Sequence, residues 1–352
     1  MENFKIIFKF TMLVVGTIVG AGLASGQEIV VFFAQYGFVS LFFVVAVFLI
    51  FFFGLRNFLF FGKCNYENDF EKKKITNIFD TISIGIFAII GSAMLAGASQ
   101  LLSTYVCDFS FPLWEIILIL ISSFVCIFGI KALLNLSIYL VPVVILGIIY
   151  VCIKSATIST LSPPTFSTDI STVSILTLSS ISYCCCNLVT ASKVIFDLGK
   201  TLTRKQATRV ALYSALILSV IIGTIIVSIL INDKMILFAD LPLVFLANII
   251  SKPVGIAFTV LILASIITTL FATQYSFINL LHEKMNKRKK TLPFMISIIL
   301  FFTVSLFGFG DIIKYFYPLI GAFGFVMIFL LRNLTFKPCL NSTNNKVHSS
   351  RK

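Results

Sequence analysis

Charge is scarce in this sequence. Only 12% of its 352 residues are Asp, Glu, Lys or Arg, whereas 59% are apolar. A typical soluble domain carries about twice that charged fraction. The chain also lacks a Gly-x-x-x-x-Gly-Lys-Ser/Thr loop, the phosphate-binding element of nucleotide-driven pumps. These shortages predict a membrane protein whose work, if it is transport, is driven by an ion gradient or by the solute itself.

Residues for enzyme chemistry are equally few. The two histidines, His282 and His348, fall at the inner end of an apolar run and in the C-terminal tail, so the middle of the apolar segments offers no histidine base to activate a nucleophile. The eight cysteines are scattered, and Cys184, Cys185 and Cys186 adjoin one another inside an apolar run. That spacing fits neither a disulfide framework nor a metal site. We therefore expect neither an enzyme nor a bound cofactor.

Long apolar runs dominate the sequence instead. A helix that crosses about 30 Å of hydrocarbon needs about 20 apolar residues. Runs of this length recur along nearly the whole chain. We count ten predicted spans, at 8–35, 38–61, 77–105, 112–130, 134–154, 173–197, 209–231, 254–281, 292–309 and 314–332.

Basic residues indicate how these spans are oriented. If the N-terminus is cytoplasmic, 23 of the 27 Lys and Arg residues lie on the cytoplasmic side, and only Lys154, Lys234, Lys252 and Lys314 lie outside. This positive-inside bias predicts a multi-pass protein of the cell membrane with both termini in the cytoplasm. The formal charge of +13 is then explained by loops that face anionic lipid, so no nucleic-acid partner is expected.

The segment 16–28 interrupts the first span with GTIVGAGLASGQE. Its paired glycines fit tight helix packing, but packing does not explain Gln27 and Glu28. A carboxylate in hydrocarbon costs at least about 2.5 kcal/mol, so it normally faces a cavity or a partner. A break near 20–25 exposes backbone carbonyls and amides, which survive at membrane depth only where they line a cavity. We predict a binding site of unwound backbone, with Glu28 as a proton-coupling acid, an amine ligand or a helix cap.

The sixth span is the expected counterpart of the first span in an inverted repeat. Five spans in each half place the first and sixth in opposite orientations, so a second break is predicted near 182–187. We assign the halves to 1–154 and 155–332, with a short outer helix near 235–250 and a cytoplasmic tail at 333–352. Polar residues that join helices together remain an alternative for the sixth span. The predicted solute-binding residues are Gly20, Ala21, Gly22, Ala24, Ser25, Gly26, Gln27, Glu28, Ser182, Tyr183 and Asn187.

The eighth span carries hydroxyls on one face. Ser265, Thr268 and Thr269 are spaced i, i+3 and i+4. Oxygen ligands of this kind suit a hard cation such as Na⁺, although threonine that bonds back to its own helix explains the same pattern.

The GxIVGAGxASGQE string, the phenylalanine-rich segment after it and AQYG resemble the YkvI-type bacterial membrane proteins over essentially the whole chain. More distantly, the first, sixth and eighth spans resemble the amino acid, polyamine and organocation superfamily. The resemblance implies an all-helical, polytopic LeuT-like fold of about ten spans. It also implies a bacterial cell membrane location.

The same resemblance implies roles for individual residues. The carbonyls of Gly16 and Val19 would join the hydroxyls of the eighth span around one sodium ion, while the amides of Ala21 and Gly22 would receive a solute carboxylate. Leu23 stands where sodium symporters with two sites carry an asparagine, which argues against a second sodium. The three adjacent cysteines also depart from the pattern.

We therefore expect a secondary transporter of a small solute, an amino acid or related amine, coupled to Na⁺ or H⁺ by alternating access. The alternative is a transporter-like nutrient sensor, such as a subunit of the germinant-receptor type, which binds without net transport. The expected partners are the solute and the bilayer, and the sequence leaves the oligomeric state open.

Overall fold

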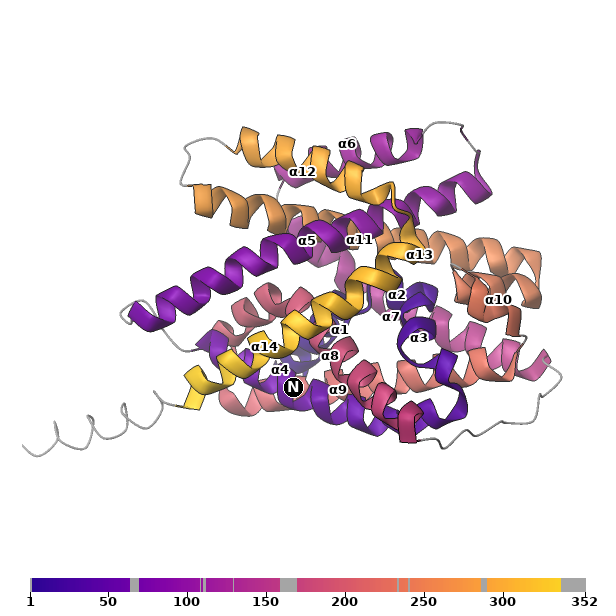
Figure 1. The fold of residues 1–352 in the computed structure, drawn as a ribbon, viewed down its shortest axis with the longest axis horizontal. Coiled ribbons are helices and arrows are strands. Elements are labelled where there is room, and N and C mark those ends of the chain that lie inside the picture. Colours follow the sequence, from indigo (N-terminus) through magenta and orange to yellow (C-terminus); the bar gives the residue numbers. More distant parts are fainter. Residues whose placement is uncertain are drawn as a thin grey trace, which may run out of the picture.

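A computed structural model describes residues 2–63, 70–107, 109, 112–128, 130–158, 170–232, 234–239, 241–285 and 290–336. Every regular element within these residues is a helix, and the longer helices pack side by side (Figure 1). The elements are α1 (Glu2–Ile18), α2 (Ala21–Ser25), α3 (Gln27–Phe32), η1 (Ala34–Leu41), α4 (Phe43–Lys63), α5 (Phe70–Tyr105), α6 (Leu113–Phe128), α7 (Ile130–Ile158), α8 (Ile170–Thr201), α9 (Arg204–Ile231), η2 (Lys234–Phe238), α10 (Pro242–Ile250), α11 (Lys252–Met285), α12 (Thr291–Ser305), α13 (Phe309–Asp311), η3 (Ile312–Phe316) and α14 (Tyr317–Phe336).

An all-helical chain is what a bilayer requires, because hydrocarbon offers no partners for backbone amides and carbonyls. Buried hydroxyls are satisfied in the same way, by bonding back to the preceding turn. Ser92 donates to the Ala88 carbonyl at 2.7 Å, and Thr259 donates to the Gly255 carbonyl at 2.8 Å. Such polar residues therefore have their hydrogen bonds satisfied within their own helix, and their presence in a span does not by itself indicate a functional site.

The lengths of the helices agree with a protein of many spans. Within the described residues, seven helices are long and apolar enough to cross a membrane, and Leu113–Cys126 and Thr291–Ser305 are shorter apolar helices. The first predicted span does not appear among them because it is broken into several pieces. The count of ten spans, and their division into two repeats, remain predictions.

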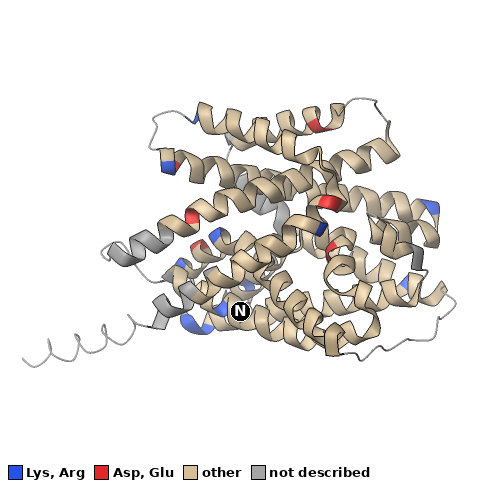
Figure 2. Cartoon of the chain, viewed as in Figure 1, with Lys and Arg blue, Asp and Glu red and all other residues tan. Residues whose placement is uncertain are grey.

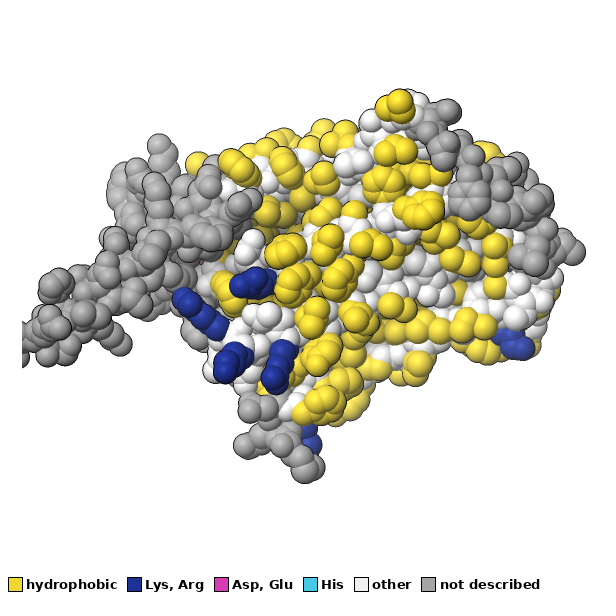
Figure 3. Space-filling model, turned by 90° about the horizontal axis from the view of Figure 1, so that it is seen from below, with side chains coloured by type: hydrophobic (Ala, Val, Ile, Leu, Met, Phe, Trp, Pro, Cys, Tyr) yellow, Lys and Arg dark blue, Asp and Glu magenta, His cyan; other side chains and the backbone are white. Residues whose placement is uncertain are grey.

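Charge separates the two ends of the helical bundle. Figure 2 shows Lys and Arg gathered mainly at one end, which we call the basic end, with few at the opposite end. Between these ends, the face in Figure 3 is covered largely by apolar side chains. An apolar belt with basic residues concentrated at one side is what a membrane-embedded protein presents to lipid.

The region of the expected short helix near 235–250 contains η2 and α10, which follow α9 and precede α11 in the chain. Its position outside the membrane stays a prediction. Pro242 begins α10, where a missing amide costs nothing.

Small residues set the closest helix contacts. A Cβ on Gly62 of α4 would overlap the Phe196 carbonyl of α8, and a Cβ on Gly199 would overlap the Leu59 carbonyl. Without side chains at both glycines, α4 and α8 approach backbone to backbone, which is how membrane helices gain packing in lipid.

A buried glutamine joins three helices on the other side of the bundle. Gln274 of α11 is fully buried, and its amide donates to Ser123 of α6 at 2.9 Å and to Ser297 of α12 at 3.2 Å. Ser122 donates to its side-chain oxygen. Every polar atom of this side chain thus has a partner, so the network fixes α6 and α12 against α11.

Candidate functional site

The first span is broken where the sequence predicted. Helix α1 ends at Ile18, Gly20 adopts an extended conformation, and α2 begins at Ala21. The Gly20 amide bonds to the Ile18 carbonyl at 2.8 Å, so the Gly16 carbonyl loses its helical partner. The interruption therefore directs free backbone groups into the middle of the bundle.

A second bend follows after one short turn. Gly26 lies in the left-handed region, with φ of 85°, which residues with a side chain rarely adopt. It ends α2 and precedes α3, whose first turn contains Glu28. The N-cap residues of the two short helices are Gly20 and Gly26, which have no side chain to form a cap. The role of Glu28 as a helix cap stays a prediction.

The predicted break in the sixth span is wrong. Helix α8 is continuous from Ile170 to Thr201. The segment contains no Pro or Gly between 171 and 198, and its polar side chains bond to their own helix: Ser180 donates to the Leu176 carbonyl at 2.7 Å, and Asn187 donates to the Tyr183 carbonyl at 3.1 Å. Nothing in the local sequence therefore stops the helical ladder.

A small cavity of about 100 Å³, which we call the central cavity, adjoins the break in the first span. Helices α1, α3, α5, α8, α11 and α14 all contribute to its wall. Its lining residues are Leu13, Gly16, Thr17, Ile18, Gly20, Glu28, Phe87, Ile90, Met94, Cys186, Asn187, Thr190, Lys193, Val194, Thr268, Thr269, Ala272, Thr273, Ser276 and Tyr317.

Glu28 is the acidic group of the central cavity. It is only 4% exposed, and its Oε2 atom has no hydrogen-bond partner among the described residues. The side-chain amide of Asn187 faces its carboxyl group. A Cβ on Gly22 would overlap that carboxyl, so Glu28 folds back over α2 and fills the space that a side chain at position 22 would take. This buried acid is poised to accept a proton or a cation.

The predicted sodium ligands are brought partly together. Thr268, Thr269 and Gly16 line the central cavity, and Thr269 lies in van der Waals contact range of Gly20. Both threonine hydroxyls donate to the Ser265 carbonyl at 2.9 Å. Their lone pairs and the Gly16 carbonyl are oxygen donors of the kind that Na⁺ prefers, so these groups fit a cation. Ser265 and Val19 are buried outside the lining of the cavity.

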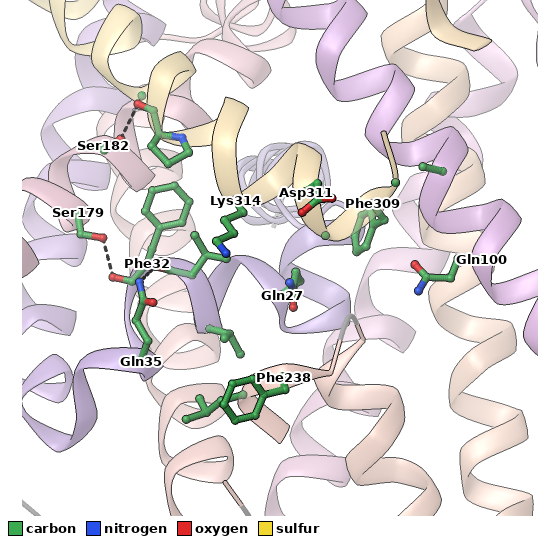
Figure 4. Close-up of a pocket in the computed structure, with 18 of the residues that line it drawn as sticks. Gln27, Phe32, Gln35, Gln100, Ser179, Ser182, Phe238, Phe309, Asp311 and Lys314 are labelled. Atoms are coloured by element: carbon green, nitrogen blue, oxygen red, sulfur yellow. Dashed lines mark hydrogen bonds between the residues drawn. The ribbon is translucent and has the colours of Figure 1, made fainter. Parts of the chain in front are cut away.

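A second and larger cavity lies on the other side of the break, toward the opposite end. This vestibule has a volume of about 1230 Å³. Figure 4 shows Gln27, Ser179, Ser182, Asp311 and Lys314 around it. The hydroxyl of Ser179 donates to the Phe32 carbonyl at 2.7 Å, and that of Ser182 donates to the Pro318 carbonyl at 3.1 Å. Helix α8 therefore holds α3 and α14 together at the wall of the vestibule.

Tyr183 of α8 follows a residue of the vestibule wall, but its own side chain lines neither cavity. It is completely buried, and its ring packs against Phe32, Phe33 and Phe51 with centroid distances of 5.5, 5.3 and 6.2 Å. Its hydroxyl has no hydrogen-bond partner among the described residues. Ser182 lines the vestibule and Cys186 lines the central cavity, so this aromatic cluster packs around a part of α8 that reaches both cavities.

The other predicted solute-binding residues divide into three sets. Gly20 and Asn187 line the central cavity, Gln27 and Ser182 line the vestibule, and the remaining ones line neither. Of that last set, Ala24 and Ser25 are fully buried, Gly26 serves the bend, and the surroundings of the Ala21 side chain lie outside the described residues.

Sequence reasoning missed several residues of both cavities. Met94 and Tyr317 face the central cavity from α5 and α14, and no motif marks either. Lys314 was expected among the outer lysines, yet it lies on the π-helix η3 in the vestibule wall. The Asp311 and Lys314 pair at the start of an apolar span was the available signal, because charges at that position normally serve a cavity.

Comparisons with known proteins support the expected fold. No family model matches the chain. It is 24% identical over 333 residues to the uncharacterized membrane protein YkvI of Bacillus subtilis (strain 168), covering 89% of this chain and 91% of that protein. It is also 24% identical over 347 residues to the uncharacterized protein YyaD of the same strain, covering 95% and 97%. The expected resemblance to YkvI-type membrane proteins is thus confirmed.

Solved structures match over most of the chain. MhsT in complex with L-phenylalanine matches with a TM-score of 0.65 and 16% identity, over 91% of this chain and 87% of that chain. Mhp1, a nucleobase-cation-symport-1 family transporter, matches with a TM-score of 0.52 and 14% identity, over 92% and 77%. A manganese transporter of Eremococcus coleocola matches with a TM-score of 0.56 and 14% identity, over 92% and 78%. These likenesses confirm the LeuT-like fold.

Proposed function

We propose that this protein is a secondary transporter of a small cationic or zwitterionic solute, an amino acid or related amine, coupled to Na⁺ or H⁺. The observation that carries the proposal is the pair of cavities on either side of a broken first span. Gln27 and Glu28 are neighbours in sequence, yet the first lines the vestibule and the second lines the central cavity. A site that is reached from one side while a partition closes the other is what alternating access needs.

The solute binds in the central cavity, against Glu28 and Asn187. Burying a carboxylate away from water without a partner costs several kcal/mol, and this cost falls when a proton or an ammonium group arrives. Lys193 also lines this cavity, and the thiol of Cys186 and the hydroxyls of Tyr183 and Tyr317 lie near the carboxyl. A change in their distance to Glu28 during opening would couple the solute to the proton.

The alternative coupling ion is Na⁺, held by the Gly16 carbonyl with Thr268 and Thr269. The free carbonyl and the two hydroxyls in one cavity support it. If a sodium gradient drives solute accumulation and a proton gradient alone does not, Na⁺ is the coupling ion.

Uptake by reconstituted vesicles tests the proposal. Purified protein in proteoliposomes should accumulate a labelled solute against its gradient when an ion gradient is imposed. Saturable binding with no accumulation under either gradient would instead identify a nutrient sensor.

A Glu28→Gln variant separates the roles of the acid, because glutamine keeps its size but loses the charge. If Glu28 carries the proton, solute exchange should survive while gradient-driven accumulation fails. If Glu28 binds the amine, both should weaken together. Glu283→Gln is the matched control, since Glu283 is exposed and lines neither cavity.

A further inference from the structure

The space over Gly22 in α2 is already filled by the protein's own acid. A solute carboxylate could not enter that space without displacing this acid. That space holds the carboxyl of Glu28, which a Cβ on Gly22 would overlap.

Among the described residues, the central cavity has no cation close to Glu28 that would balance the charge of a second carboxylate, brought by the solute. Lys193 is the basic side chain in its lining, and it lies six residues beyond Asn187 on α8, or about 9 Å along the helix. It is exposed and interacts with Asp80 of α5 at the basic end. A solute carboxylate next to Glu28 would therefore meet a like charge at short range and a cation only at long range, and such a contact costs several kcal/mol.

Size limits the solute further. The cavity of about 100 Å³ equals roughly three water molecules at about 30 Å³ each. Drug-sized ligands occupy about 300–1,000 Å³. The side chains of Phe87, Met94 and Tyr317 close the cavity from α5 and α14, so an ammonium group with a short neutral body fits.

We infer that the central cavity selects small amines that lack a carboxylate, because Glu28 supplies from the protein the carboxylate that an amino acid would bring. The inference rests on the proposed transport function and narrows its substrate class. Asn187 donates to the acid or to the neutral part of the solute, and the unpartnered Oε2 atom of Glu28 receives the ammonium group.

Pairs of solutes that have nearly the same shape, one with a carboxylate and one without, test this inference. Glycinamide and alaninamide replace the carboxylate of glycine and alanine by a neutral amide. At pH 6.5 their amines are largely charged, since an α-amino group has a pKa of about 7.7–8.0. Binding to the purified full-length protein in lipid nanodiscs should favour each amide over its amino acid by at least about tenfold.

Two substitutions locate the preference. Glu28→Gln should weaken glycinamide at least about tenfold and bring the two members of each pair within about threefold of each other. Glu28→Ala also vacates the space over Gly22 and removes the like charge, so the preference for the amide should disappear in this variant as well. Glu283→Gln, at an exposed residue of α11 that lines neither cavity, should leave the ratio of the wild-type protein unchanged.

Three results would overturn the inference. They are tighter binding of glycine than of glycinamide by the wild-type protein, an unchanged ratio in a folded Glu28→Gln variant, and no binding of either pair. The wild-type ratio decides the matter even if the variants do not fold. Proteoliposomes that accumulate amino acids but not amines would refute the inference and leave the transport proposal intact, whereas accumulation of no solute would refute the transport proposal itself.

Discussion

Gly22→Ala tests the contact on which the description of the site depends. The new methyl group would overlap the carboxyl group and Cγ of Glu28, and both residues are enclosed by packed helices. Forcing a methyl group into a filled space typically costs about 1–3 kcal/mol. We expect the free energy of unfolding to fall by that amount and solute binding to weaken, because the carboxyl must leave its position.

A double-mutant cycle of Gly22→Ala with Glu28→Ala measures the interaction energy between these two positions. In the double variant the new methyl group at position 22 enters space that the glutamate has vacated, so the cost of Gly22→Ala should largely disappear. We expect a coupling energy of at least about 1 kcal/mol, against about 0.5 kcal/mol or less for residues that do not touch. Equilibrium unfolding in mixed micelles measures all four proteins under one condition.

The matched control is Gly85→Ala on α5. A Cβ at Gly85 meets no atom within 4 Å, and alanine is the better helix former, so stability should rise or stay constant. Additive effects of Gly22→Ala and Glu28→Ala would show that the two residues do not touch, and the explanation for small-amine selectivity would fall with that contact.

Three further outcomes follow from the contacts of individual side chains. Replacing Thr268 and Thr269 with valine should change stability by less than about 1 kcal/mol, because both hydroxyls bond only to their own helix; if they hold Na⁺, the sodium dependence of solute binding should disappear in the same variant. Gln274→Leu should lower stability by about 1–3 kcal/mol, because it leaves buried serine hydroxyls without their partner, and an unchanged unfolding curve would contradict the network. Tyr183→Phe removes a buried hydroxyl that has no partner among the described residues, so thermal stability without solute should stay equal or rise by up to about 1 kcal/mol; a clear loss would show that the hydroxyl is satisfied.

The sequence by itself determined the solvent, the helical class and the first break. Apolar runs long enough to cross a bilayer leave helices as the available structure, since every backbone group must find a partner within its own segment. The interruption of the first span was predictable because glycine is a poor helix former, and the second bend needs the positive φ that Gly26 adopts readily. Charge in the loops indicated the two ends of the bundle in the same local way.

The tertiary structure decided what the local pattern leaves open. Polar residues in the sixth span looked like a second break, but the same hydroxyls and amides can bond to their own helix, and in α8 they do. Which side chains face a common cavity depends on how six helices rotate and pack, so Met94 and Tyr317 carried no signal in sequence. Likewise, only the fold of the chain back on itself puts the carboxyl of Glu28 over Gly22. They are six positions apart along the chain, and the left-handed turn at Gly26 lies between them.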